Sequence, residues 1–131
     1  PPGLALSPAG FLYVTAYKHN SVLKFDEDGR FVGQIVPGDV PFDGPVGLAF
    51  DSKKNLYVVE EKGCRVRKFD AKGTLLATYG GQGQETGKFR GPRGIAVGPT
   101  DYQRRLQFVI SGAVDPDRRI ALKRKGRGAG W

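Results

Sequence analysis

The stretch GPVGLAF at residues 44–50 decides the fold of this chain, because closely related words occur at two other places. Residues 91–97 read GPRGIAV and residues 1–6 read PPGLAL. One motif of Pro, Gly, Ala and apolar residues therefore occurs three times. The repeated prolines and glycines are Pro2, Gly3, Pro45, Gly47, Pro92 and Gly94. Internal repetition with a period of roughly 20–50 residues is typical of solenoids and propellers.

Three apolar runs follow each of the first two copies of this motif, in the same order and at similar spacing. They are FLYV, SVLKFD and RFVGQIV after the first copy, and LYVV, RVRKFD and TLLATYG after the second. Each run is short, rich in β-branched or aromatic residues and bounded by turn residues, which predicts a strand. DEDG at 26–29 and DAKG at 70–73 have the composition of hairpin loops in which Gly adopts the left-handed conformation.

These runs predict an all-β chain of four-stranded antiparallel blades, that is, a partial β-propeller of two to three blades, since four strands in about 45 residues is the size of one blade. The motif glycine and alanine are expected on the innermost strand, where small side chains let neighbouring blades converge, and the proline fixes the entry of that strand. We place blade 1 at residues 1–43, blade 2 at 44–90, a partial blade 3 at 91–117 and a basic, flexible tail at 118–131.

The repeats resemble NHL repeats, whose consensus runs roughly Pro-x-Gly-[IVL]-Ala, then Gly-Asn-[IL]-Tyr-Val, then Asn-x-Arg-[VI] and Phe. The second repeat carries the resemblance best, at Pro45, Gly47, Ala49, Asp51, Asn55, Leu56, Tyr57, Val58, Arg65, Val66, Phe69 and Gly73. The family has Asp after Tyr-Val, where this chain has Ala16 and Glu60, and a later Asn, where it has His19 and Gly63. We expect those changes to affect local hydrogen bonding and not function.

The number of repeats raises the question of how the propeller closes. A closed propeller needs about 4–8 blades, and the resemblance implies six. Either two copies of this chain close a six-bladed ring, or the chain is part of a larger propeller or assembly. The start on the repeat motif and the lack of Met favour the second reading.

The sequence contains no catalytic constellation, and we predict a protein that is not an enzyme and carries neither metal nor cofactor. His19 is the only histidine, and Cys64 the only cysteine. We interpret His19 as a loop residue and Cys64 as structural. Some members of the family that the repeats resemble are lyases, and a site of their kind binds a metal through several histidines drawn from several blades. One histidine does not supply such a site. A fragment of a propeller lyase or hydrolase stays as an alternative.

Basic residues are concentrated in the second half of the chain. Residues 61–131 contain 16 Lys and Arg against 6 Asp and Glu, whereas residues 1–60 contain 5 against 7. A basic surface attracts nucleic acid or acidic partners. The candidate basic surface comprises Arg65, Arg67, Lys68, Arg90, Arg93, Arg104 and Arg105.

We predict a platform that binds a protein partner, as the resemblance implies, with binding of single-stranded RNA through the basic half as the alternative. No apolar run approaches the roughly 18 residues of a membrane span. The absence of a leader and of a cysteine pair favours an intracellular location only slightly, and we leave the compartment unknown.

Overall fold

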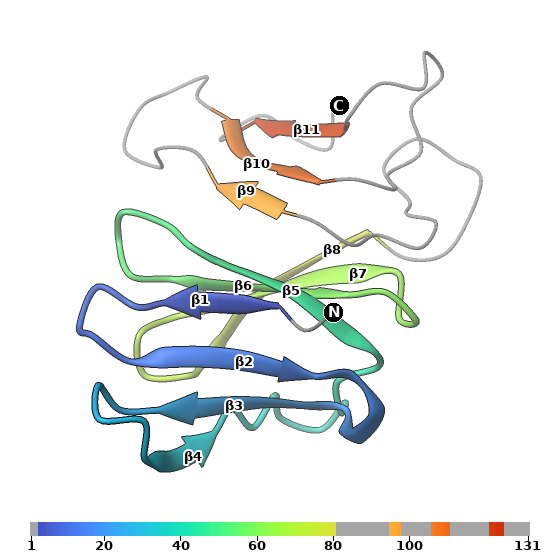
Figure 1. Cartoon of the computed structure of the whole chain (residues 1–131). Helices are drawn as coiled ribbons and strands as arrows, with labels where there is room; N and C mark the ends of the chain where they lie inside the picture. Colours follow the sequence, from blue (N-terminus) through green and yellow to red (C-terminus); the bar gives the residue numbers. More distant parts are fainter. Residues whose placement is uncertain (1–2, 81–94, 98–105, 111–120, 125–131) are drawn as a thin grey trace.

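The computed structural model describes residues 3–80, 95–97, 106–110 and 121–124. These residues form three antiparallel sheets stacked on one another (Figure 1). The first two sheets have four strands each, in the orders β1-β2-β3-β4 and β5-β6-β7-β8, and the third has the order β11-β10-β9. The strands are β1 (Leu4–Leu6), β2 (Leu12–Ala16), β3 (Ser21–Phe25), β4 (Phe31–Gln34), β5 (Pro45–Phe50), β6 (Leu56–Glu60), β7 (Arg65–Phe69), β8 (Leu75–Gly80), β9 (Ile95–Val97), β10 (Leu106–Ile110) and β11 (Ala121–Arg124).

The sheets are the blades that the repeats predict, and we call them blades 1, 2 and 3. Within blades 1 and 2, consecutive strands are joined in a meander, and a single 3-10 turn, η1 (Tyr17–His19), joins β2 to β3. The predicted hairpin loops are confirmed, because Gly29 and Gly73 adopt φ angles of 82° and 89°. In the second loop the Oδ1 atom of Asp70 accepts hydrogen bonds from the backbone N–H groups of Lys72 and Thr74, which closes the turn.

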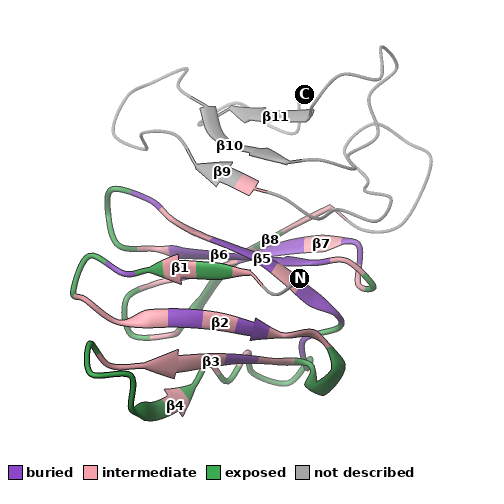
Figure 2. Ribbon diagram, viewed as in Figure 1, coloured by how far each residue is buried: buried purple, intermediate pink, exposed green. Residues whose placement is uncertain are grey.

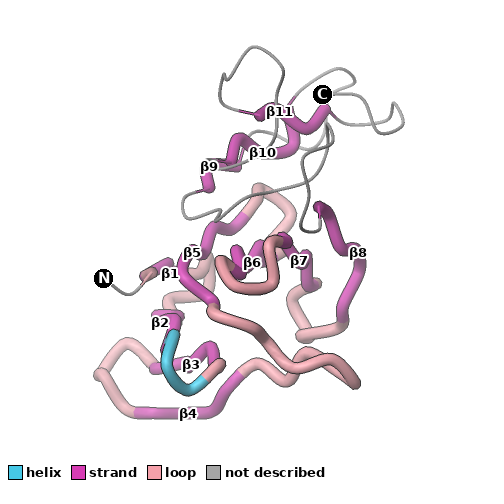
Figure 3. The backbone as a smooth tube through the Cα atoms, turned by 90° about the vertical axis from the view of Figure 1, so that its right-hand side faces the viewer, coloured by secondary structure: helices cyan, strands magenta, loops and turns pink. Residues whose placement is uncertain are grey.

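The inner strands β1, β5 and β9 lie along one side of the stack, and β4 and β8 diverge from it (Figure 3). Gly3 shows why the motif needs a glycine there. A Cβ atom on Gly3 would collide with the carbonyl oxygen of Val46 and would lie 3.0 Å from the Cα atom of Gly47. The motif glycine therefore lets the first strands of neighbouring blades approach. Pro2, Pro92 and Gly94 lie outside the described residues.

The core is divided between the two sides of blade 2 (Figure 2). Successive residues of a strand point to opposite faces, and on β6 both faces are buried. One face packs against blade 1 in a cluster that includes Tyr13, Val22, Leu48, Val58 and Phe69. The opposite face, with Tyr57, Val59, Cys64 and Val66, packs against Ile95 of blade 3.

Blade 3 corrects one prediction. Residues 121–124 lie in the segment that we predicted to be a flexible tail, yet they form β11 and pair with β10. The strand was missed because its sequence, ALKR, is not an apolar run, and main-chain hydrogen bonds to β10 do not require one. The blade boundaries themselves stay a prediction.

Candidate functional site

The candidate basic site of blade 2 is built on two neighbouring strands. Arg65 and Arg67 lie two residues apart on β7 and share one face of the sheet, as predicted. Both point to Glu60 at the end of β6. The Nε and Nη2 atoms of Arg67 lie 2.7 and 2.9 Å from the Oε2 and Oε1 atoms of Glu60, and Nη2 of Arg65 lies 2.8 Å from Oε1. One carboxylate therefore binds two guanidinium groups.

The same guanidinium groups hold the segment that leads from blade 1 into blade 2. Arg67 donates hydrogen bonds to the carbonyl oxygens of Val40 and Pro41, at 2.8 and 2.9 Å. Its Cζ atom lies 5.0 Å from the centroid of the Phe42 ring, which is itself buried. The backbone N–H of the next residue in the segment donates to Glu60. The cluster thus fastens the segment between the blades to blade 2.

This arrangement corrects the placement of Arg67 on an exposed basic surface. Arg67 is 2% exposed and Glu60 is 0% exposed, so neither is accessible to a partner. Arg65 is more open, with 21% of its side chain exposed. The hydrogen bond that Glu60 accepts raises the pKa of the Arg65 guanidinium above its usual value, against the lowering effect of burial. The pair therefore acts as a structural clamp in which the basic charge is already neutralised in part.

Lys68 follows Arg67 near the end of β7, and its side chain is half-buried. Its Nζ atom is 5.6 Å from the centroid of the Tyr57 ring. The other members of the predicted basic surface, Arg90, Arg93, Arg104 and Arg105, lie outside the described residues. In the described part of blade 2, the predicted surface is therefore reduced to Lys68 and the exposed portion of Arg65, which lie on opposite faces of the sheet.

His19 and Cys64, whose side chains are of the types that bind metals or act as nucleophiles, do not form a site. His19 is exposed at the end of η1, and Cys64 is buried with a left-handed φ of 53° and its Sγ atom 3.5 Å from the carbonyl oxygen of Glu61. Within the described ranges, no group of three or more His, Cys, Asp and Glu side chains is arranged to hold a metal ion. None of the helices there is long and apolar enough to cross a membrane.

A second buried polar cluster surrounds Asp51, after β5. Its Oδ1 atom accepts hydrogen bonds from the N–H groups of Lys53 and Asn55, and its Oδ2 atom accepts from the side chains of Asn55 and Tyr57. Burial, and then the charge of Asp51, raise the pKa of Tyr57 well above its usual value. Burial likewise raises the pKa of Tyr79. A phenol whose ionisation is opposed in this way stabilises a turn and is poorly suited to act as a base.

The outer face of blade 1 is an exposed apolar surface. It is formed by side chains that the strand register places on the side away from blade 2, namely Leu4, Leu6, Leu12, Val14, Leu23, Phe25 and Phe31. Leu4, Leu6 and Phe31 are 61%, 69% and 60% exposed. Figure 2 shows exposed positions on β1 and β4. In blade 2 the residues 44 positions later in the sequence, such as Leu48 and Leu56, are 8% and 3% exposed, because blade 1 covers them.

The comparisons with known proteins agree with this architecture. No family model matches the chain, and no curated protein matches its sequence. Among solved structures, virginiamycin B lyase from Staphylococcus aureus aligns with 98% of this chain and 42% of its own, at 18% identity and a TM-score of 0.63. A chain of a nidogen/laminin complex aligns with 92% of this chain and 48% of its own, at 20% identity and a TM-score of 0.58.

The chain has the fold of part of a β-propeller. It spans less than half the length of either of these two structures. One of them is a lyase and the other belongs to a protein complex, so the shared fold does not by itself select a function.

Proposed function

We propose that this chain is a non-enzymatic protein-interaction segment of an NHL-type β-propeller, and that it binds a partner through the outer face of blade 1. One observation carries the proposal. A sheet face that is buried between blades in blade 2 is left exposed in blade 1, with Leu4 and Leu6 at 61% and 69% exposure. A contiguous exposed apolar face is typical of an interaction surface.

The partner that this face fits is another propeller sheet. Blade 1 covers the equivalent face of blade 2 with Tyr13, Val22 and flanking apolar side chains. A partner sheet that presents a similar aromatic and branched surface would bury Leu4 and Leu6 in the same way. Full burial of one leucine side chain contributes about 1.5–3 kcal/mol, so burial of Leu4 and Leu6 would contribute measurably to the contact.

The RNA-binding alternative is weakened by the geometry of blade 2. Arg67 is buried on Glu60, and its remaining hydrogen bonds go to the segment between the blades. A side chain that is fully engaged in this way does not contribute to phosphate binding. The lyase alternative gains no observation from the described residues.

The test is the mass of the full chain in solution, measured by light scattering during size-exclusion chromatography. The 14.2 kDa chain is expected to form a dimer or a discrete larger assembly. Leu6→Asp should convert that assembly to a monomer, because it buries a charge in the contact. Leu76→Asp is the matched control, since Leu76 is 50% exposed on blade 2. It should leave the mass unchanged.

Two results would overturn the proposal. One is a wild-type chain that stays monomeric at tens of micromolar with the circular dichroism of a folded β protein. The other is an assembly that Leu6→Asp and Leu76→Asp weaken equally, because that assembly would not use the outer face of blade 1.

A further inference from the structure

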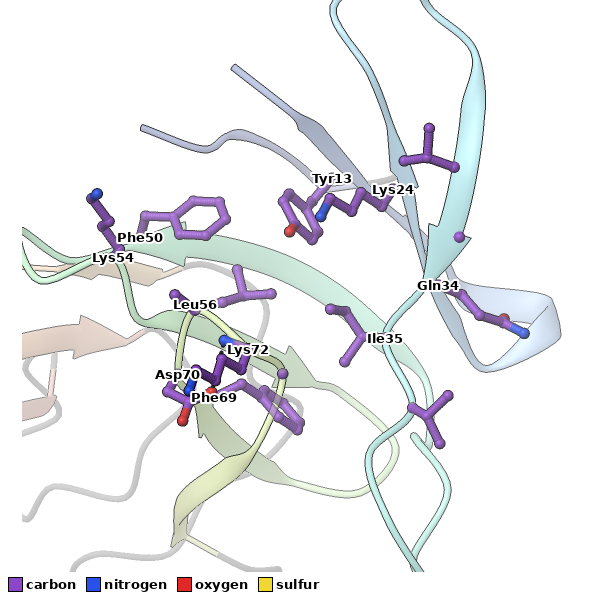
Figure 4. A pocket seen from close by; sticks show the side chains of 15 residues that line it. Tyr13, Lys24, Gln34, Ile35, Phe50, Lys54, Leu56, Phe69, Asp70 and Lys72 are labelled. Carbon is purple, nitrogen blue, oxygen red and sulfur yellow. Dashed lines mark hydrogen bonds between the residues drawn. The ribbon is translucent and has the colours of Figure 1, made fainter. Parts of the chain in front are cut away.

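A separate cavity of about 390 Å³ lies between blade 1 and blade 2 (Figure 4). Blade 1 contributes β4 and the residues after it, and blade 2 contributes the end of β5 and the turn at residues 70–73. Cavities of this volume are in the range that binds small ligands or single large side chains. The cavity belongs neither to the cluster around Glu60 nor to the outer face of blade 1.

The floor of the cavity is apolar and rigid. Leu56 and Phe69 are 3% and 0% exposed, and the ring of Tyr13 packs edge to face on Phe50 with centroids 5.2 Å apart. These side chains form part of the core between the blades, so their positions are fixed by packing. At the mouth, Val36 is 71% exposed and extends the apolar surface along blade 1.

Three lysines, Lys24, Lys54 and Lys72, surround this floor. None of them forms an ion pair with any residue that the structure describes. The Nζ atom of Lys24 is 4.1 Å from the centroid of the Phe11 ring, which does not line the cavity, and 5.7 Å from that of Tyr13, which does, so the ammonium group lies at the edge of the cavity. Figure 4 shows Lys24 and Lys72 entering the space from opposite blades, with Lys54 at the outer end beside Phe50.

Among the described residues that line the cavity, one is a carboxylate. Asp70 lines the cavity, and its Oδ1 atom is already used by the backbone N–H groups of its own turn. The cavity therefore combines an apolar floor with an excess of positive charge. It is complementary to a ligand that has an apolar group flanked by carboxylates.

We infer that this cavity binds an acidic peptide segment of a protein partner, with one aromatic or branched side chain of the peptide inserted between the blades. This inference rests on the proposed function, because it assumes that the chain binds a protein partner. β4 is the outermost strand of blade 1, so no described strand pairs with its outer edge. An extended peptide can pair with such an edge through main-chain hydrogen bonds while its side chains fill a neighbouring pocket.

The geometry favours a peptide over a nucleic acid. Tyr13 and Phe50 are packed edge to face against each other. Binding of single-stranded nucleic acid relies on ring faces that are open for bases to stack on. The cavity offers an apolar hole with amines at its rim instead, which suits a side chain and its flanking carboxylates.

The experiment is an NMR titration of the isotope-labelled full chain with the capped peptide acetyl-Glu-Glu-Phe-Glu-Glu-amide. Shift changes are expected at Gly33, Ile35, Lys54 and the 70–73 turn. The double variant Lys54→Glu/Lys72→Glu should weaken binding about tenfold, because both lysines are exposed and their reversal removes two attractions. Lys53→Glu is the matched control, since Lys53 is exposed on the same loop as Lys54 but does not line the cavity.

Each alternative outcome is informative. Equal binding of the glutamine peptide acetyl-Gln-Gln-Phe-Gln-Gln-amide would overturn the charge argument, and equal binding of the peptide with Ala in place of Phe would overturn the pocket argument. Equal weakening by Lys53→Glu, no binding at millimolar peptide, or stronger and overlapping shifts with octauridylate would each overturn the assignment to an acidic peptide. The mass test uses the opposite face of blade 1, so failure of one test leaves the other result readable.

Discussion

Replacing the buried ion cluster of blade 2 by the apolar pair that blade 1 carries at the same repeat positions would measure how these charges contribute to stability. Glu60 and Arg67 each follow their blade 1 counterparts, Ala16 and Leu23, by 44 residues. The variants are Glu60→Ala, Arg67→Leu and the double variant, which gives blade 2 the residues of blade 1. The three variants and the wild type form a double-mutant cycle.

Each single substitution leaves a buried charge without its most buried partner. Glu60→Ala removes the acceptor of three guanidinium hydrogen bonds. It leaves Arg67, which is 2% exposed, without its carboxylate partner. Arg67→Leu leaves the Glu60 carboxylate, which is 0% exposed, with only Arg65 and one backbone N–H. Removing one partner of a buried ion pair costs about 3–5 kcal/mol, so each single variant should lose roughly that much.

The double variant should lose much less than the sum. Apolar residues of suitable volume often replace a buried ion pair with little or no loss. The remaining loss comes from the two hydrogen bonds that Arg67 donates to Val40 and Pro41 and from the two that Glu60 accepts from Arg65 and the backbone of Asp43, about 1 kcal/mol each. The coupling free energy is therefore expected to be about 2 kcal/mol or more.

Urea unfolding of the full chain, followed by far-ultraviolet circular dichroism, gives the four free energies of unfolding. Lys68→Gln is the control on the same strand and should change the free energy of unfolding by less than about 0.5 kcal/mol. Single-variant losses that add to the double-variant loss within about 0.5 kcal/mol would refute the reasoning, because additivity means that the two side chains do not interact.

Three further predictions use the same assay. Gly3→Ala should lower the free energy of unfolding by about 1–3 kcal/mol, because the added Cβ would collide with the carbonyl oxygen of Val46. A variant as stable as the wild type would show that the inner strands separate easily. Asp51→Ala should lower the free energy of unfolding by roughly 1–2 kcal/mol more than Asp70→Ala does. The carboxylate of Asp51 is buried and accepts four hydrogen bonds, whereas that of Asp70 accepts two. Equal losses would contradict this. The pKa of Tyr57 is raised in the folded chain, so the contribution of this phenol to stability should be constant below about pH 10, where the phenol of the unfolded chain is protonated. Above that pH its contribution should fall by about 1.4 kcal/mol per pH unit. Tyr57→Phe should make the alkaline fall in stability shallower, and an unchanged slope would count against the buried phenol.

The blades could be predicted from the sequence because their signals are local. Alternating apolar runs specify strands, and Gly29 and Gly73 specify hairpin loops through a backbone conformation that glycine adopts without strain. Repetition then specified the order of the strands in the first two blades. For β11 this reasoning failed, because an edge strand can be held by main-chain pairing with little help from its side chains.

The burial of Arg67 could not be predicted in the same way. A period of two correctly places Arg65 and Arg67 on one face, but it does not say what covers that face. The cover is the segment that contains Val40 and Pro41, more than 20 residues earlier in the sequence. Glu60 was the available signal: an acidic residue inside a buried strand needs a cationic partner, and the neighbouring strand offers two arginines.

The difference between the two blades bears on the proposed interface. In blade 2, Arg65 and Arg67 bind the carbonyl groups of a segment that arrives covalently from the preceding blade. Blade 1 has Ser21 and Leu23 at the corresponding positions, so it offers no guanidinium to a similar segment. The contact that we propose on the outer face of blade 1 therefore lacks this clamp and depends on apolar side chains such as Leu4 and Leu6. For that reason Leu6→Asp is its most direct test.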